Sequence, residues 1–263
     1  MSELAITPPE TVAASRPANA WTAYRILLGW TLIRMGGTVL PLVMVVQALL
    51  AAGVIVGFSL LLPDIDAGSA RFLATGTPTA LLLIAGLVMV PSGVAQARAD
   101  GTFIYQRTMP IPRPLLLAVE LTVWSLVAVP SVAVALTVAQ LRFGLAFAFQ
   151  WPLLIAVIVI ITVTSASVGF GLAGSLPPAL THLTTQVLVF VILLFSPVSF
   201  PASRLPAWFQ AVHDWLPIRP AADLLRAGLA ADVYPFSVRD LAVLLGWCCV
   251  GVAVSLYALT QRP

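Results

Sequence analysis

The sequence has no lysine and little charge of either sign. Its 263 residues include 13 arginines and 10 acidic residues, and charged residues make up 9% of the chain. Ordinary soluble domains contain roughly 25% charged residues, so too little polar surface is present to cover a water-soluble globule of this size. Apolar residues make up 60% of the chain, and the mean hydropathy is +1.03. We therefore expect a protein of the lipid bilayer and exclude a cytosolic enzyme, a secreted disulfide scaffold and a nucleic-acid-binding domain.

The missing lysine also limits nucleotide chemistry. A P-loop needs a lysine to reach the β- and γ-phosphates of ATP, so this chain has no Walker-type ATP site of its own. Cys248 and Cys249, the two cysteines, are adjacent within an apolar run, whereas metal-binding cysteines are spaced and occur with further ligands. We expect no catalytic residue, no metal site and no cofactor in this chain.

Six long apolar segments predict an all-α integral membrane protein with six transmembrane helices. A bilayer core about 30 Å thick needs roughly 20 apolar residues in a helix. No formal charge occurs between Arg142 and Arg204, and because this segment is too long for one crossing we divide it at Gly174–Pro178. The six predicted spans cover residues 36–62, 72–97, 114–141, 150–174, 180–199 and 241–259.

The N-terminal region predicts two further parts. Residues 1–20 are rich in proline, alanine and serine, which indicates a flexible cytoplasmic segment without a cleavable signal, ahead of a six-span domain over 21–263. Residues 20–34 place Trp21, Tyr24 and Leu28 at helical spacing, which predicts a short helix in the membrane interface. A frayed extension of the first span is the alternative.

The arginines of the short loops predict the orientation. Six arginines precede the first span or lie between the second and third, whereas the first and third loops of the opposite side hold only Arg71 and Arg142. Because arginine accumulates on the cytoplasmic side, we expect a multi-pass protein of the cell membrane with both termini cytoplasmic. The long connection before the last span weakens this count, since it contains four arginines and four aspartates.

Two patterns suggest an enzyme, and each has a better explanation. Gly169-Phe-Gly-Leu-Ala-Gly174 matches a dinucleotide-binding fingerprint, but no acidic residue follows about 20 positions later. Close packing of helices through small residues explains it better. Ser175 with His182 or His213 could form an intramembrane serine protease, but we expect these residues at or near the membrane surfaces rather than in a shared cavity.

Two features within the predicted spans have alternative interpretations. Glu120 is the only ionisable residue well inside a span, yet it lies only about 9 Å along the helix from Pro114. An interfacial or hydrogen-bonding role is therefore favoured over a role in coupling or substrate passage. Gly53-Val-Ile-Val-Gly57 is a helix-packing pattern that indicates contact with another span or another subunit.

The most informative segment is residues 97–114, the longest polar stretch on the predicted cytoplasmic side. Asp100-Gly-Thr102 opens a helix-compatible run, and three prolines at 110–114 close it. Phe103-Ile-Tyr105 is unusually apolar for a free loop. A short helix with an apolar face and arginines is suited to docking by another protein.

This segment resembles the coupling-helix region of type-2 ABC exporter permeases. In that family an acidic-Gly-Thr element leads through an apolar helix to Thr-Pro or Met-Pro, here Met109-Pro110, and then into the third span. The family often has Leu-Glu where this chain has Phe103-Ile104. That difference affects an acid-mediated contact with the ATPase and not the fold.

The resemblance extends to the C-terminal half. Phe195–Pro201 with Leu205-Pro-Ala-Trp208 is similar to the family's fifth-span exit, and Leu216–Pro220 with Leu224-Leu-Arg226 resembles the arginine-bearing helix that follows. Arg219 stands where the family usually has asparagine. Taken together these blocks cover essentially the whole chain, and the daunorubicin-resistance-type drug exporters are the branch it resembles most.

The resemblance implies a permease subunit of an exporter for a hydrophobic or amphipathic drug, antibiotic or lipid, with lipid-linked polysaccharide as an alternative substrate. A separate ATP-binding subunit would bind ATP and Mg²⁺, and a second permease chain, identical or different, would complete the path. A stand-alone intramembrane hydrolase and an ion-coupled carrier are the hypotheses from other classes. The residues expected to carry coupling are Asp100, Gly101, Thr102, Arg107 and Pro110.

Further residues are candidates for the substrate path. Trp208, Val212 and Trp215 form an apolar helix face, which predicts a re-entrant or amphipathic outer segment and a gate. A plain extracellular loop with an amphipathic helix is the alternative. The predicted path or gate residues are Glu120, Gln186, Trp208 and Trp215, and the path hydroxyls and amides are Thr162, Thr164, Ser165, Thr185 and Gln47.

Overall fold

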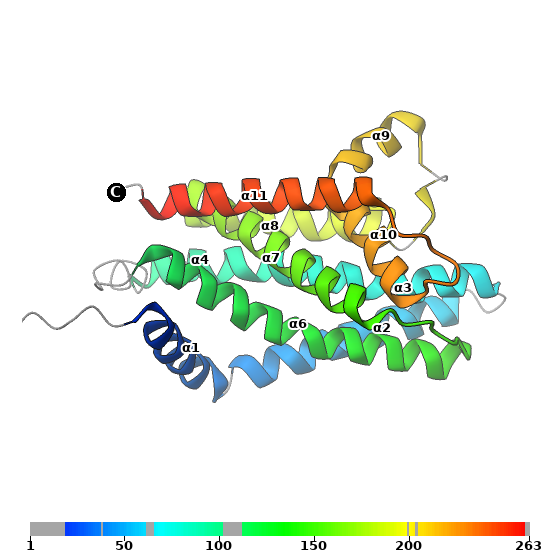
Figure 1. Ribbon diagram of the computed structural model, residues 1–263, viewed down its shortest axis with the longest axis horizontal. Helices are drawn as coiled ribbons and strands as arrows, with labels where there is room; N and C mark the ends of the chain where they lie inside the picture. Colours follow the sequence, from blue (N-terminus) through cyan, green and yellow to red (C-terminus); the bar gives the residue numbers. More distant parts are fainter. Residues whose placement is uncertain are drawn as a thin grey trace, which may run out of the picture.

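The computed structural model describes residues 19–37, 39–61, 66–101, 112–198, 200–202 and 205–260. Every regular element in this part of the chain is a helix (Figure 1). The elements are α1 (Ala20–Gly36), α2 (Val39–Leu61), α3 (Ala67–Ile84), η1 (Ala85–Met89), α4 (Val90–Ala99), α6 (Arg113–Phe143), α7 (Trp151–Ser175), α8 (Pro178–Phe190), η2 (Val191–Phe195), α9 (Ala207–Trp215), α10 (Ile218–Leu229) and α11 (Val238–Thr260).

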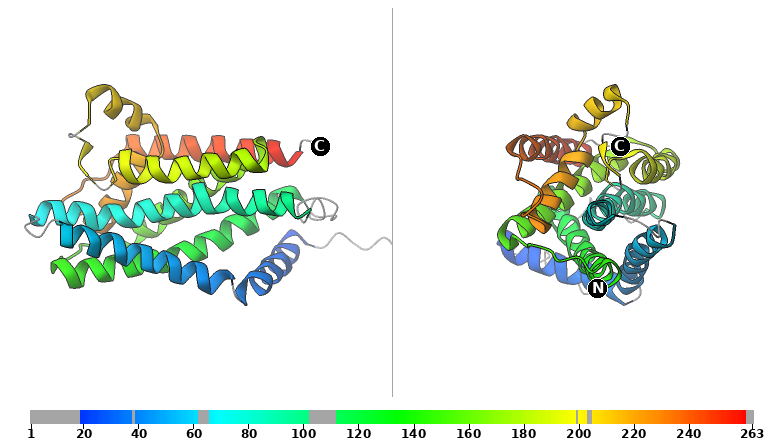
Figure 2. Two further views of the ribbon diagram at one scale, coloured as in Figure 1. Left: turned by 180° about the vertical axis from the view of Figure 1, so that it is seen from behind. Right: turned by 90° about the vertical axis from the view of Figure 1, so that its right-hand side faces the viewer.

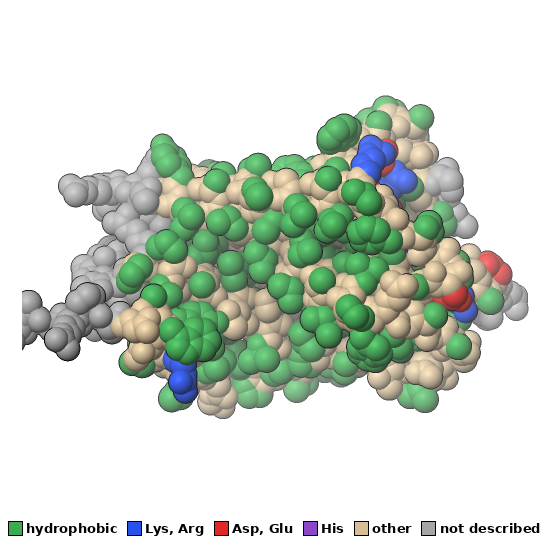
Figure 3. All heavy atoms as spheres, in the orientation of Figure 1, with side chains coloured by type: hydrophobic (Ala, Val, Ile, Leu, Met, Phe, Trp, Pro, Cys, Tyr) green, Lys and Arg blue, Asp and Glu red, His purple; other side chains and the backbone are tan. Residues whose placement is uncertain are grey.

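Six helices are long and apolar enough to cross a membrane, which confirms the predicted all-α membrane protein with six spans. They cover Leu40–Leu61, Ala67–Ala99, Pro114–Phe143, Trp151–Ser175, Pro178–Phe195 and Val238–Ala258. The second of these is one continuous column of α3, η1 and α4. Figure 3 shows hydrophobic side chains along the whole length of one face, with arginine and acidic side chains towards the ends, as a bilayer requires.

Local sequence explains where the helices begin and end. Asp66 accepts a hydrogen bond from the Ser69 backbone N–H at 2.9 Å and caps the start of α3. Proline occupies the first turn of α6, α7 and α8, where its missing N–H costs nothing. Gly144, with a φ of +63°, ends α6 in the left-handed conformation that glycine adopts without strain.

The spans divide the molecule into two ends (Figures 1 and 2). At the α4 end lie α1, the last turn of α4, the start of α6 and the C-terminus of α11. At the α10 end lie α9, α10, the last turn of α2, the start of α3 and the connection from α6 to α7. Helix α1 is separate and turns sharply away from α2, so it is not the continuous extension of the first span that we considered as an alternative.

The column α3–η1–α4 and helix α7 form the centre of the bundle. In the most apolar 18-residue stretch, 89% of the column's residues are buried, against 17% in α2, in α8–η2 and in α11. The column crosses α7 at two glycines: a Cβ added at Gly169 would lie 2.2 Å from the carbonyl oxygen of Gly86. On its other side α7 packs against α11, where a Cβ at Gly174 would lie 2.4 Å from the Cβ of Ala258. The glycines of the Gly169–Gly174 pattern therefore serve helix packing, as the sequence indicated.

Candidate functional site

Helix α4 ends in a glycine turn at the predicted coupling segment. Asp100 is the C-cap residue of α4, and Gly101 follows with a φ of +75°, a conformation that glycine adopts at little cost. The carboxylate of Asp100 accepts hydrogen bonds at 2.9 and 3.1 Å from Nε2 of Gln96 on the same helix. The other residues predicted to carry coupling, Thr102, Arg107 and Pro110, lie outside the described residues.

Arg98 connects the last turn of α4 to the end of α7. Its Nη1 donates hydrogen bonds to the carbonyl oxygens of Ala173 at 2.5 Å and Leu176 at 2.8 Å. These carbonyls belong to the C-terminus of a helix, where intrahelical partners are missing and the helix dipole favours a cation. From the sequence we used Arg98 to end the second span and to predict the orientation. Its contact with α7 could not be predicted, because a single sequence does not show which helix end an arginine side chain reaches.

The helix on the other side of the coupling segment is joined to α1. The hydroxyl groups of Tyr24 on α1 and Thr122 on α6 lie 2.7 Å apart and share a hydrogen bond. Glu120 lies two positions earlier on α6, is half-buried and takes part in at least one interaction within the chain. The two helices that flank the coupling segment, α4 and α6, are thus each hydrogen-bonded to another helix at the α4 end.

The α10 end contains a fully buried arginine. The side chain of Arg226 is 1% exposed, and its Nη2 donates to the carbonyl oxygen of Val198 at 2.6 Å. Its Nη1 donates to Asp223 at 2.8 Å, and the guanidinium lies 3.7 Å from the ring centroid of Phe72. Gly76 on α3 makes room for this group, because a Cβ there would lie 1.9 Å from the Val198 carbonyl oxygen. Burial lowers the pKa of the Arg226 guanidinium, and Asp223 opposes that shift.

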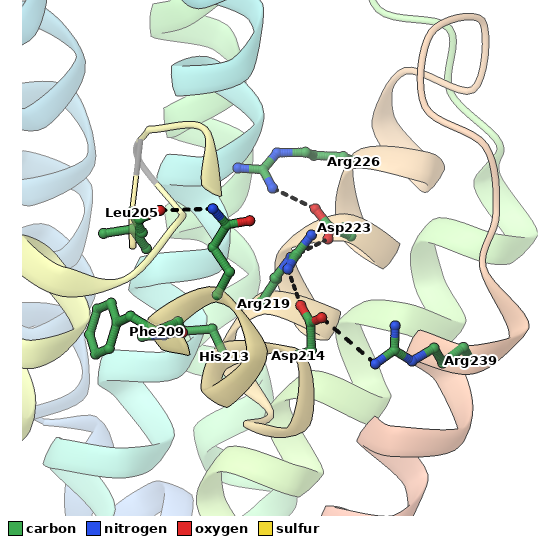
Figure 4. Close-up of polar contacts among 9 residues, drawn as sticks. Leu205, Phe209, His213, Asp214, Arg219, Asp223, Arg226 and Arg239 are labelled. Atoms are coloured by element: carbon green, nitrogen blue, oxygen red, sulfur yellow. Dashed lines mark hydrogen bonds and ion pairs between the residues drawn. The ribbon is translucent and has the colours of Figure 1, made fainter. Parts of the chain in front are cut away.

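Arg226 begins a chain of alternating charges across three helices (Figure 4). Asp223 lies 3.6 Å from Arg219 on the same helix, and Arg219 in turn pairs with Asp214 at the end of α9. Asp214 lies 3.7 Å from Nη2 of Arg239 at the start of α11. This charge chain (Arg226, Asp223, Arg219, Asp214 and Arg239) fastens α9, α10 and α11 to one another.

Comparison with known families decides between the predicted classes. Residues 22–230 match the family model of the ABC-2 type transporter, a stretch that runs from α1 to the segment just after α10. The chain belongs to this family. It is therefore a multi-pass permease of the kind that serves as the membrane component of ABC-2 exporters, a family without its own ATP site. A search of curated protein sequences gives no match.

The segment of the permease that is buried between the last two spans is α10 rather than α9. Ten of the 12 residues of α10 are buried, and the helix packs among α3, α7 and α11. Helix α9 lies at the periphery (Figure 1), and the predicted gate residues Trp208 and Trp215 are 69% and 68% exposed. The apolar face predicted from sequence thus exists and is directed outward. Gln186, on α8, is also exposed.

The polar residues predicted for a substrate path are mostly packed inside the permease. Thr162, Ser165 and Thr185 are buried, and each donates to a carbonyl oxygen of its own helix. Gln47 and Thr164 are buried as well. In this conformation these side chains take part in helix packing.

The residues of the serine-protease hypothesis are not brought together. The Ser175 hydroxyl donates to the carbonyl of Gly171 at 2.8 Å, at the C-terminus of α7. His213 is buried at the opposite, α10 end, with Nδ1 3.0 Å from the carbonyl oxygen of Phe209. His182 is exposed on α8, and no hydrogen bond in the described part of the chain joins it to Ser175. The described part of the chain also contains no cluster of three or more side chains that could hold a metal ion.

Proposed function

We propose that this permease is the membrane subunit of an ATP-driven exporter that moves a hydrophobic or amphipathic substrate, such as a drug, an antibiotic or a lipid, across the cell membrane. A separate ATP-binding subunit binds ATP and Mg²⁺ and docks at the α4 end. The permease contributes no catalytic group and no cofactor. Its own residues receive the movement of the ATPase and pass it to the spans.

The arrangement of the α4 end is the observation that carries this proposal. The coupling segment lies between α4 and α6. Helix α4 is hydrogen-bonded to α7 through Arg98, and α6 is hydrogen-bonded to α1 through Thr122. A displacement of the segment would therefore act on α7 and on α1 directly. The absence of lysine supports the assignment of ATP chemistry to another chain.

The proposal is tested by purifying the permease through a tag after co-expression with an ABC ATPase encoded beside its gene. We expect a stoichiometric complex whose ATP turnover falls in Arg107→Gln. The matched control is Arg142→Gln, which removes an arginine at the α10 end that bonds Ser59 at 2.9 Å. Purification of the permease alone, or equal turnover in both variants, would contradict the proposal.

We further propose that both termini are cytoplasmic. In a variant without Cys248 and Cys249, single cysteines replace Asp100 at the α4 end or Val233 at the α10 end, two exposed positions. A membrane-impermeant maleimide added to intact cells should label Val233→Cys, and should label Asp100→Cys only after the membrane is opened. The reverse pattern would invert the orientation.

A second permease chain completes the transporter in this proposal. Helix α2 supports it, because added Cβ atoms at Gly53 and Gly57 meet nothing within 4 Å in this chain, and Leu49 and Leu60 beside them are 67% and 70% exposed. The packing pattern therefore has no partner among the described helices. Cysteine at position 57 should cross-link two chains in the membrane, whereas cysteine at the exposed Leu183 of α8 serves as the comparison.

A further inference from the structure

A groove of about 520 Å³ runs along α11 beside the end of α9. Its floor is formed by small or branched residues on one face of α11: the neighbours Ala242 and Val243, then Gly246 and Val250, each three to four positions further along the helix. Trp215 and Trp247 also line the groove, and Arg239 lies at one end. The groove is thus apolar along its length, with the positive charge of Arg239 at its mouth.

The dimensions and depth of the groove match one leaflet of a bilayer. From Arg239 to Val250 the helix rises about 16 Å, close to half of a hydrocarbon core about 30 Å thick. Arg239 lies in the first turn of α11, at the membrane surface, and the groove extends from there towards the middle of the span. Nε1 of Trp247 donates to the carbonyl oxygen of Trp215 at 2.7 Å and joins these two lining residues.

The guanidinium of Arg239, at the mouth of the groove, has N–H groups available for a further hydrogen bond. The side chain of Arg239 is 60% exposed, lies 5.8 Å from the ring centroid of Trp215 and makes only a long pair of 3.7 Å with Asp214. Asp214 is already engaged by Arg219, so Arg239 is the weakly paired end of the charge chain (Figure 4). The neighbouring Asp240 is not among the residues that line the groove. A guanidinium in this position presents a fork of donors that fits a phosphate group.

We propose that this groove binds a phospholipid of the surrounding leaflet, with the lipid phosphate on Arg239 and one acyl chain along Ala242, Gly246 and Val250. The site does not depend on the transported substrate, and its failure would leave the proposed function intact. A bound lipid would cover the exposed faces of Trp215 and Trp247 and hold α9 against α11.

The test is titration of delipidated, full-length permease in detergent with phosphatidylglycerol, phosphatidylcholine or diacylglycerol, with bound lipid counted by native mass spectrometry. Arg239→Gln removes the charge, and Arg71→Gln is its control at the same end. Gly246→Leu fills the groove, since nothing lies within 4 Å of an added Cβ there, and Gly53→Leu is the equally open control on α2. We expect Arg239→Gln to weaken binding of the two phospholipids by about tenfold or more, the worth of one hydrogen bond to a charged group. We expect Gly246→Leu to weaken the same binding because its side chain occupies the place of the acyl chain. We expect both controls to bind as the unaltered chain does. Diacylglycerol, which lacks the phosphate, should bind more weakly than the phospholipids to the unaltered chain and should be insensitive to Arg239→Gln.

Each other outcome overturns the proposal. Equal phospholipid binding by the groove variants and their controls would show that lipid binds elsewhere. If inorganic phosphate displaces the lipid fully and Gly246→Leu has no effect, Arg239 is an anion site without an acyl groove. If Gly246→Leu no longer forms a dimer but binds lipid as the unaltered chain does, the groove is an interface with a second copy of the permease and not a lipid site.

Discussion

The crossing of α7 with η1 gives the most sharply defined test of the fold, through Gly169→Ala. An added Cβ would lie 2.2 Å from the carbonyl oxygen of Gly86 and 2.9 Å from Cδ of Pro91, whereas ordinary contacts begin at 3.4 Å. The two backbones must therefore separate locally by about 1.2 Å, the difference between 3.4 and 2.2 Å. Forcing extra carbon into a packed interior costs about 1–3 kcal/mol. Alanine regains up to about 1 kcal/mol of helix propensity, so we expect a net destabilisation of about 1–2 kcal/mol.

The matched control is Gly53→Ala, because nothing lies within 4 Å of its added Cβ. Here only the propensity gain applies, and the stability should stay unchanged or rise by up to about 1 kcal/mol. Both variants are measured by equilibrium unfolding in the same detergent. Only Gly169→Ala should lower the free energy of unfolding. If Gly169→Ala is as stable as Gly53→Ala, the close approach of α7 and η1 is wrong.

Further predictions concern the two ends of the bundle. Arg226→Met should lower the free energy of unfolding by about 3 kcal/mol, because it strands the buried Val198 carbonyl and part of the charge on Asp223. Arg71→Met should cost less than about 1 kcal/mol in the same assay, since its pair with Asp232 is solvent-exposed. If the two variants lose equal free energy of unfolding, the burial of Arg226 does not matter for stability. Arg98→Gln should speed hydrogen–deuterium exchange at residues 172–176 relative to Gln96→Ala, and equal exchange would show that Arg98 does not hold the end of α7. Burial raises the pKa of Tyr234 above its usual 10.0, so the native state holds this proton more tightly than the unfolded state. The stability from Tyr234 is thus present below about pH 10 and lost as the pH rises through the higher native value. Tyr234→Phe should flatten that decline in an alkaline unfolding series.

The spans could be predicted from composition because a bilayer leaves the backbone few alternatives to a helix. The boundaries were less predictable. We began the second span at residue 72 because Arg71 is charged, but α3 already starts at Ala67. Arg71 is accommodated because its side chain reaches Asp232 at the α10 end. A charged residue marks a span boundary only when no partner lies within reach of its long side chain.

The polar contacts of the candidate sites were mostly beyond sequence reasoning. Gly101 could be predicted as a turn residue because its conformation is a local property. Arg226 was counted among the arginines of the last connection and noted through a family resemblance, and its burial could not be inferred. Its partners Val198 and Phe72 lie far away in the chain, and only the packing of α10 against α3 brings them together.

Helix α7 is held at its two ends by the two candidate regions. At the α4 end Arg98 binds its last carbonyls. At the α10 end the backbone N–H of Gln150 donates to the carbonyl of Gly228 at 3.0 Å, and Gly228 is so close that an added Cβ would lie 3.1 Å from the Cα of Leu154. A straight helix transmits displacement along its axis without requiring side chains to rearrange between its ends. Changes at Arg98 and Gly228 are therefore expected to be non-additive in transport-coupled ATP turnover although they lie at opposite ends of the bundle, whereas distant sites ordinarily add. Additive effects would place the connection between the ends in another helix.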